Sequence, residues 1–284
     1  MSTKVDLSFL NGIPHMMSDD ELKFLFELLK KNFSGKGIIV DLGCRFGAST
    51  LVICKALQHV KTKQKICACD TFHWDEECET QLKNHPDKEY FKNNGYLALF
   101  KENLSNFIED IELIVDIRNS NIQTPVEILI VDVMKSEETA QLVIEKYYKA
   151  LIPGKSFVYQ QDFDHFLTPW VQVISYLYRN YFYVYKDIKN SGGIWFFYKK
   201  LIPDELLHIE FHTLPESEID KAFRWALKIS NKKKHKGIAA AHVMSYIYRK
   251  DKNKAFDLWC QYLYQGYELS GEFVDLQRRL EELK

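Results

Sequence analysis

The chain carries two kinds of apolar pattern, short continuous runs and longer stretches in which apolar residues recur at helical spacing. Short apolar runs bounded by turn residues are typical of strands that are buried on both faces of a parallel sheet. Apolar residues that recur every three or four positions predict amphipathic helices. Because the two kinds of segment alternate along the chain, the pattern predicts an α/β fold with a doubly wound sheet.

The apolar runs predict strands at residues 37–43, 66–70, 111–117, 126–132, 156–160, 182–185 and 193–198. The connection between the last two holds Asn190, Ser191 and Gly192, which is typical of the turn of an antiparallel hairpin. The helical spacing predicts helices at residues 18–34, 48–59, 136–151 and 169–181.

Two regions fall outside this alternation. Residues 73–106 are polar, with scattered aromatic side chains, and they are too long for a plain connection. We expect short helices there that cap the functional site. Further along, Pro203 and Pro215 flank a connection, and only helical periodicity follows. We therefore predict two domains, residues 1–200 and a C-terminal domain of three or four helices at residues 201–284.

The composition is that of an ordinary globular protein, with 46% apolar and 27% charged residues. The formal net charge of -1 provides no basic field, so a nucleic-acid partner is disfavoured. The first residues show no basic region followed by an apolar run, and no stretch approaches the roughly 20 apolar residues of a membrane span. The six cysteines include no CxxC pair, which favours reduced thiols. We therefore expect a cytoplasmic protein without a membrane span.

The sequence DLGCRFGAST at residues 41–50 follows a predicted buried strand and opens a predicted helix. A parallel sheet offers a ligand a crevice and a helix N-terminus at this place. Gly43 permits a tight turn with close approach of a ligand, and Gly47 permits close packing at the helix start. Glycines that only turn the chain are the alternative. Asp70 favours the ligand site, because it ends the next predicted strand, where a Rossmann-like fold places an acid for ribose hydroxyls.

An NAD-linked oxidoreductase would need the same acid and is therefore a rival prediction. Enzymes of that class surround a pyrophosphate with a G-x-G-x-x-G loop. In this chain Arg45 stands at the position of the middle glycine, which disfavours the rival.

Five segments together resemble the class I methyltransferases that use S-adenosylmethionine (SAM), within the branch of the macrocin and related sugar O-methyltransferases. The resemblance covers about residues 10–200, and the segments are IPHMMSDDELKFLFELLKK (13–31), VDLGCRFGAST (40–50), CDTF (69–72), ILIVD (128–132) and LIPGKSFVYQQD (151–162). The resemblance implies a Rossmann-like, seven-stranded, doubly wound sheet with an antiparallel last strand, followed here by a C-terminal helical extension. It also implies an enzyme that methylates an oxygen of a sugar, a glycoconjugate or another small polar acceptor.

The resemblance also implies roles for individual residues. Asp41 and Gly43 would line the methionine part of SAM, and Asp70 would hold its ribose. Asn119 and Ser120 would lie near the adenine ring. The full cofactor-binding set that we predict is Asp41, Gly43, Cys44, Arg45, Gly47, Ser49, Thr50, Asp70, Thr71, Phe72, Asn119, Ser120 and Asp132.

Methyl transfer to oxygen needs a base within reach of the acceptor hydroxyl. By the resemblance Asp132 would face the transferred methyl group, although a helix N-cap is an alternative role. Asp162, Asp164 and His165 are the candidates for the base. Asp164 could orient His165, and an exposed loop histidine is an equal alternative. The predicted catalytic residues are Asp132, Asp162 and His165.

Metal-dependent members of this branch carry acidic residues that the chain lacks. They have a second Asp two residues after the one that matches Asp132, and an Asp-Asp pair after the fifth strand. Met134 and Gln161 stand at those places here. Asp132 and Asp162 could hold Mg²⁺ together with Gln161 and waters, but a required metal is not favoured. The missing acids also motivate a second rival, a non-catalytic methyltransferase-like binding module.

The predicted C-terminal helices carry more apolar surface than a short appendage can hide. The residues are Phe223, Trp225, Leu227, Ile229, Tyr246, Tyr248, Phe256, Leu258, Trp259, Tyr262, Leu263, Tyr264 and Tyr267. This surface predicts packing on the catalytic domain or on a second subunit, and we favour a homodimer. The basic run at residues 232–236 could bind an anionic partner, but a solvated loop is the favoured interpretation.

Overall fold

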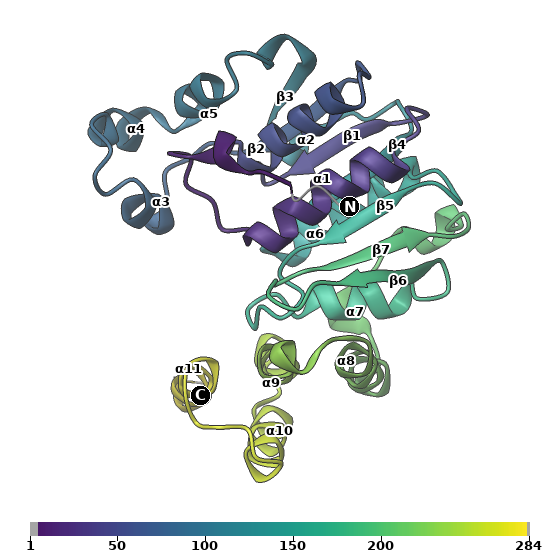
Figure 1. The fold of residues 1–284 in the computed structure, drawn as a ribbon. Helices are drawn as coiled ribbons and strands as arrows, with labels where there is room; N and C mark the ends of the chain where they lie inside the picture. Colours follow the sequence, from purple (N-terminus) through teal and green to yellow (C-terminus); the bar gives the residue numbers. More distant parts are fainter. Residues whose placement is uncertain (1–4, 283–284) are drawn as a thin grey trace. The chain divides into compact units, whose positions relative to one another are not determined.

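The structure, a computed structural model (Figure 1), describes residues 5–282. These residues belong to two compact units. The first unit comprises the residues up to Val133 and Ala150–Ile152, and the second comprises Met134–Lys149 and the residues from Pro153 on. Among the described residues, seven strands form one sheet in the order β3-β2-β1-β4-β5-β7-β6. They are β1 (Ile38–Leu42), β2 (Ile66–Asp70), β3 (Ile111–Val115), β4 (Val126–Val131), β5 (Phe157–Gln160), β6 (Phe182–Asp187) and β7 (Ile194–Tyr198). The predicted Rossmann-like sheet is confirmed.

The strands of the first unit are parallel. β1 pairs with β2 and β4, and β2 pairs with β3. Every residue of β1 and β4 is buried, as their continuous apolar runs predict. Helices α1 (Asp19–Asn32) and α2 (Ala48–His59) pack against each other. α1 begins at a capping box, in which Ser18 and Glu21 each accept the backbone N–H of the other through their side chains.

A buried carboxylate fixes the turn between α1 and β1. Glu127, on β4, is fully buried. Its Oε1 accepts the backbone N–H of Ser34 at 2.6 Å, and its Oε2 accepts those of Lys36 and Gly37 at 2.9 and 3.2 Å. Three donors that the turn would otherwise leave unpaired are thereby satisfied. These bonds therefore fix the position of the turn before β1 relative to β4.

Three short helices follow β2, as predicted for residues 73–106. They are α3 (Glu76–Gln81), α4 (Lys88–Asn94) and α5 (Leu97–Asn103), and Figure 1 shows them one after another outside the strands. We call residues 72–106 the cap segment. Its buried apolar side chains include Phe72, Cys78, Leu82, Phe91, Leu99, Phe100 and Leu104. The cap segment is therefore a packed part of the first unit.

The second unit contains the three antiparallel-paired strands, in which β7 runs antiparallel to both β5 and β6. Its helices are α6 (Glu137–Lys146), α7 (Trp170–Leu177), α8 (Glu216–Ile229), α9 (His235–Tyr248), α10 (Lys252–Tyr264) and α11 (Glu272–Glu282). α8 packs on α7, and α9 packs on α8, α10 and α11. The boundary near residue 201 stays a prediction, because residues 201–282 share this unit with β5, β6 and β7. In the described part of the chain, no helix is long and apolar enough to cross a membrane.

Two helices of the second unit are shorter than predicted. α6 ends at Lys146 rather than at residue 151, because Leu151 forms a parallel bridge with Val126 and so has left the helix. α7 ends at Leu177 rather than at residue 181, because the chain must turn before it enters β6. In both cases the tertiary fold overrides a favourable helical pattern.

The basic run at residues 232–236 is used within the second unit. The Lys234 side chain is only 1% exposed, and its ammonium group donates to Asp187 Oδ1 at 2.7 Å and to a backbone carbonyl at 2.9 Å. Lys233 and Lys236 also donate to side chains of this unit. The interpretation of the whole run as a solvated loop is therefore wrong for Lys234, whose charge is compensated inside the fold.

A buried polar cluster joins α8, α9 and α10. His242, 4% exposed, contacts Asp220 Oδ1 through Nε2 at 2.9 Å and the Tyr262 hydroxyl through Nδ1 at 2.8 Å. The Tyr246 hydroxyl donates to the same Asp220 oxygen at 2.8 Å. Because a carboxylate accepts, we assign the proton of neutral His242 to Nε2, so that Nδ1 accepts from Tyr262. Both ring nitrogens are then satisfied.

We expect the protein to lose stability as the pH falls below about 6.5, because neutral His242 must become charged in a buried place. Burial lowers the pKa of His242, although the bond to Asp220 opposes this shift. A folded-state pKa below the unfolded value gives a stabilisation that is present above the unfolded pKa and is lost on acidification. For one proton the loss approaches about 1.4 kcal/mol per pH unit. Urea unfolding between about pH 7.5 and 5 measures it.

His242→Gln is the matched control, because glutamine can donate to Asp220 and accept from Tyr262 but does not titrate. The other charged or titratable groups around His242 are Asp220, Tyr246, Tyr262, Lys254 and Arg224. The bond from His242 lowers the pKa of Asp220 below its ordinary value of 3.8. The contribution of the Asp220 carboxylate to stability is therefore lost only at a pH below the range in which His242 titrates. Equal pH slopes for the variant and the wild type would contradict this role of His242.

Candidate functional site

Backbone hydrogen bonds bring predicted site residues to one edge of the sheet in the first unit. The Asp132 N–H donates to Leu42 O at 2.8 Å and joins the ends of β4 and β1. The Gly43 N–H donates to Cys69 O at 2.8 Å and joins the ends of β1 and β2. Gly43, Asp70 and Asp132 therefore lie at the carboxyl ends of neighbouring parallel strands. Open α/β sheets bind their ligands at such an edge.

The loop after β1 requires glycine at its first position. Gly43 has φ +87°, in the left-handed region, and a Cβ there would lie 2.7 Å from the Asp132 carbonyl oxygen. Any side chain would force the loop away from the end of β4. Gly47 is the N-cap of α2, and a Cβ on it would lie 2.9 Å from Leu104 of the cap segment. Both predicted glycines therefore allow close packing around the loop.

Asp41 lies within β1 with a buried carboxyl group. Its Oδ2 accepts hydrogen bonds from the Ser49 and Thr50 hydroxyls at 2.8 and 2.7 Å, so these two predicted residues hold Asp41 in place. Its Oδ1 is buried and has no hydrogen-bond partner among residues 5–282. Burial raises the pKa of the Asp41 carboxyl to about 6, against the lowering effect of the two hydroxyls. A buried acceptor without a partner, such as Asp41 Oδ1, favours a ligand that places a hydrogen-bond donor or a cationic group next to it.

Asp70, at the end of β2, accepts three hydrogen bonds. Its Oδ2 accepts the Arg45 backbone N–H at 2.9 Å, and its Oδ1 accepts the Phe72 N–H at 3.0 Å and the Tyr96 hydroxyl at 2.7 Å. A carboxylate offers about four acceptor positions, so about one is left for a ligand. Tyr96 was not among the predicted residues, because nothing in the pattern of the cap segment distinguishes it from the other aromatic residues there.

The side chain of Arg45 ties the loop to the cap segment. Its guanidinium donates to both oxygens of Asp75, at 3.1 and 3.0 Å, and its Nε donates to Gln81 Oε1 at 2.9 Å. Asp75 is the N-cap of α3, and its side chain also accepts the Cys78 N–H at 2.7 Å. The backbone of Arg45 therefore binds Asp70, whereas its guanidinium group pairs with Asp75 of the cap segment.

The remaining predicted cofactor residues differ in exposure. Thr71 and Asn119 are exposed, and the Asn119 amide donates to a carbonyl of β3 at 2.8 Å. Ser120, Cys44 and Phe72 are buried. Burial raises the pKa of the Cys44 thiol well above its usual value, so this group is uncharged. The side chains of Thr71 and Asn119 are therefore accessible to a ligand from solvent, whereas those of Ser120, Cys44 and Phe72 are covered by other residues.

Asp162 and His165 lie after β5, in the second unit. Asp162 has φ +58° and forms an ion pair with Lys135. His165 is exposed, and its ring centroid lies 5.8 Å from that of Phe166. The carboxylate of the neighbouring Asp164 lies close to Gly192, where a Cβ would be 3.3 Å from its Oδ1. Their predicted catalytic roles stay predictions.

Among the residues that the structure describes, no group of three or more His, Cys, Asp or Glu side chains is arranged to hold a metal ion. The two predicted carboxylate ligands, Asp132 and Asp162, belong to different units of the chain. The prediction that no metal is required, with Asp132 and Asp162 as the candidate ligands of a weak Mg²⁺ site, is not tested by the structure.

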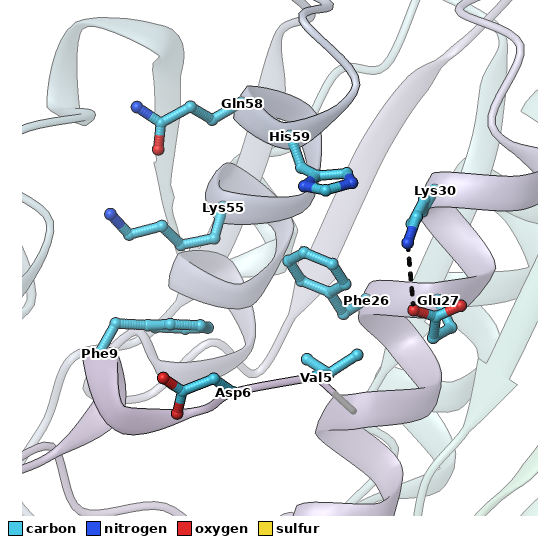
Figure 2. Close-up of a pocket in the computed structure, with 9 residues that line it drawn as sticks. All are labelled: Val5, Asp6, Phe9, Phe26, Glu27, Lys30, Lys55, Gln58 and His59. Atoms are coloured by element: carbon cyan, nitrogen blue, oxygen red, sulfur yellow. Dashed lines mark ion pairs between the residues drawn. The ribbon is translucent and has the colours of Figure 1, made fainter. Parts of the chain in front are cut away.

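A separate cavity of about 370 Å³ opens beside α1 and α2 (Figure 2). Its lining residues are Val5, Asp6, Phe9, Phe26, Glu27, Lys30, Lys55, Gln58 and His59. Figure 2 shows the ion pair between Lys30 and Glu27, whose N–O distance is 3.6 Å. The α2 residues of this cavity lie in the last turns of that helix, whereas the glycine loop joins its first turn. The cavity is therefore distinct from the candidate site.

No protein-family model matches the sequence, and no curated protein matches it either. Among solved structures the chain is similar to the O-methyltransferase NovP, with 13% identity and a TM-score of 0.47 over 64% of this chain and 80% of NovP. It is similar to the calicheamicin methyltransferase CalS11, with 15% identity and a TM-score of 0.44 over 68% of this chain and 86% of CalS11. It is also similar to an rRNA methylase from Streptococcus thermophilus, with 18% identity and a TM-score of 0.41 over 66% of this chain and 100% of that one. Two of these proteins are named as methyltransferases and the third as an rRNA methylase.

Proposed function

We propose that the chain is a SAM-dependent methyltransferase that acts on an oxygen of a sugar, a glycoconjugate or another small polar acceptor. The observation that carries this proposal is the carboxyl edge of the sheet in the first unit. There the buried Asp41 lies on β1, Gly43 follows that strand, and Asp70 ends the neighbouring strand β2. The sheet has seven strands and its last strand, β7, is antiparallel to its neighbours, as the sequence resemblance implies.

The residues at this edge suit the polar parts of SAM. Asp41 and the backbone of Gly43 would receive the methionine part, since a ligand ammonium group can donate to Asp41 Oδ1. Asp70 would receive the ribose, and Asn119 and Ser120 would lie near the adenine. When bound, SAM supplies a methyl group attached to a positively charged sulfur. The role of the chain is to hold that group and to orient an acceptor toward it.

For the acceptor we propose Asp132, Asp162 and His165 as the residues that orient the hydroxyl and take its proton. A carboxylate or a neutral imidazole can act as a general base within hydrogen-bond reach. No metal is required in this scheme. The net charge of -1 favours a small acceptor over RNA, whose phosphates need basic contacts. We place the protein in the cytoplasm, where its six unpaired cysteines would stay reduced.

Isothermal titration with S-adenosylhomocysteine (SAH) tests the proposed cofactor. We expect saturable, one-to-one binding, and folded protein that gives no binding heat at millimolar SAH would overturn the proposal. Saturable binding of NADH by protein that does not bind SAH would instead support the oxidoreductase. The release of SAH from SAM, measured with glycosides, nucleotide sugars or ribosomal RNA added separately, distinguishes the acceptor classes. SAH binding without turnover on any of them would favour a non-catalytic module.

We also propose that two chains associate through their C-terminal helices. The second unit itself buries part of the apolar surface that motivates this proposal, including Phe223 and Tyr246. On α10, however, Tyr264 is 94% exposed and Phe256 is 50% exposed. These two side chains support a contact with a second copy, because association would remove them from water.

Replacing Phe256 and Tyr264 together with serine is expected to convert a dimer into a monomer, because it removes the apolar contact. Light scattering on the full-length chain measures the mass. Deleting residues 201–284 is a poorer test, since α8 packs on α7 and its loss would expose a core. Tyr90→Ser, at a 55% exposed position on α4, is the control and should leave the mass unchanged. A monomeric wild type would refute the association.

A further inference from the structure

The carboxylate of Asp70 does not have enough free acceptor positions for a ribose diol. Its Oδ1 accepts from Phe72 N at 3.0 Å and from the Tyr96 hydroxyl at 2.7 Å, so its two lone pairs are used. Its Oδ2 accepts from Arg45 N at 2.9 Å and keeps one lone pair. The two hydroxyls of a ribose need two acceptors if both are to donate. Asp70 alone therefore supplies one of the two.

The Tyr96 oxygen can supply the second acceptor. A phenol donates one proton and accepts through its oxygen lone pairs. Because Tyr96 directs its proton to Asp70, its oxygen remains able to accept a hydrogen bond beside the carboxylate. Burial and the neighbouring Asp70 raise the pKa of the Tyr96 hydroxyl, so the phenol keeps the proton that it donates.

We propose that Tyr96 is a cofactor-binding residue, which together with Asp70 forms a two-acceptor site for the ribose hydroxyls of SAM. One ribose hydroxyl donates to Asp70 Oδ2, and the other donates to Tyr96 Oη. This inference rests on the proposed function, and it adds Tyr96 to the cofactor-binding residues that the sequence predicts.

The cap segment holds Tyr96 in a fixed position before any ligand binds. The Tyr96 backbone N–H donates to Phe72 O at 2.9 Å. Its ring lies edge-on to those of Phe46 and Phe72, with centroids 5.0 and 5.8 Å away. The residue as a whole is 3% exposed. A side chain that is already fixed loses little conformational freedom on binding, so its hydrogen bond contributes more fully to affinity.

The site makes the cap segment part of cofactor recognition. The bonds from Arg45 to Asp75 and Gln81 tie the glycine loop to α3, and the bond from Tyr96 ties Asp70 to the start of α5. Both connections run between the strand ends and the cap segment. A ligand on Asp70 therefore also contacts the cap segment through Tyr96.

Tyr96→Phe tests the proposal, because it removes one hydroxyl and keeps the packed ring. Isothermal titration on the full-length chain would use three ligands, SAH and its 2′-deoxy and 3′-deoxy forms. We expect Tyr96→Phe to weaken SAH binding by about 5- to 15-fold, the change for one lost hydrogen bond. We also expect one deoxy form to bind equally well to variant and wild type, because the hydroxyl that Tyr96 accepts is absent from it.

Tyr90→Phe is the matched control, since Tyr90 lies on α4 of the same cap segment and is 55% exposed. It should leave the affinity for all three ligands unchanged. Two results would overturn the proposal: SAH binding by Tyr96→Phe that is as tight as wild type or tighter, or equal weakening for all three ligands. The second result would show that Tyr96 acts only through the fold. A wild type that binds no SAH would instead refute the proposed function itself.

Discussion

Asp187→Ala is expected to lower the free energy of unfolding by about 3 to 5 kcal/mol, because it leaves the ammonium group of Lys234 buried without a charge partner. The two side chains are 2.7 Å apart, and that of Lys234 is 1% exposed. The Asp187 carboxylate also accepts the backbone N–H of Asn231 at 2.6 Å and its amide at 2.9 Å. The variant therefore also loosens the turn between α8 and α9. Urea unfolding followed by circular dichroism measures the change.

Two further variants separate the charge effect from a general effect of substitution. Lys232→Met changes an exposed lysine of the same run and should stay within about 0.5 kcal/mol of wild type. Combining Asp187→Ala with Lys234→Met should recover part of the loss, because no unpaired buried charge remains. An Asp187→Ala protein as stable as wild type would show that Asp187 does not compensate the Lys234 charge.

Asp70→Ala is expected to weaken SAH binding by about 1.5 to 3 kcal/mol, which is roughly 10- to 150-fold. It removes the proposed ribose acceptor, and it also frees the three donors that hold the carboxylate. Isothermal titration measures the affinity, and thermal unfolding monitors whether the domain remains folded. We expect the fold to survive, because Asp70 lies at the end of β2 and the strand itself is buried.

Asp116→Ala is the matched control for this variant. It removes a carboxylate from the end of the neighbouring strand β3, where Asp116 pairs with Arg118. Its SAH affinity should stay within about twofold of wild type. Unchanged SAH affinity in a folded Asp70→Ala protein would show that Asp70 is not the ribose acid.

The strand ends that carry the candidate site could be predicted because the pattern there is unambiguous. β2 and α2 begin and end at the predicted residues, Ile66–Asp70 and Ala48–His59. A buried parallel strand needs apolar residues on both faces, so the end of the apolar run marks the end of the strand, although the buried Asp41 falls within β1. The positions of Gly43 and Asp70 follow directly from this constraint.

The contacts of the cap segment could not be predicted in the same way. Its helices are six or seven residues long, and a periodic apolar pattern that short cannot show which face of each helix is buried. The bonds from Tyr96 to Asp70 and from Arg45 to Asp75 join residues 26 and 30 positions apart. Such pairs depend on how the cap segment packs, and no local propensity encodes that packing.

The burial of Lys234 was missed for a related reason. A run of basic residues between two helices resembles a solvated loop when only its own sequence is considered. The carboxylate that compensates Lys234 ends β6, 47 positions earlier in the chain. Only the tertiary fold brings this strand end to the turn between α8 and α9.

The close contact between α9 and the loop after β5 has a consequence for protein engineering. A Cβ on Gly237 of α9 would stand 1.9 Å from the Asp164 carbonyl oxygen, and near the other end of the helix the Tyr248 hydroxyl donates to Leu167 O at 3.2 Å. The backbone of the loop after β5 is thus shaped to fit α9, a helix that follows much later in the sequence. A chimaera that receives a foreign loop at residues 161–168 will meet a helix surface shaped for another backbone. Loop and helix therefore have to be transplanted as one cassette.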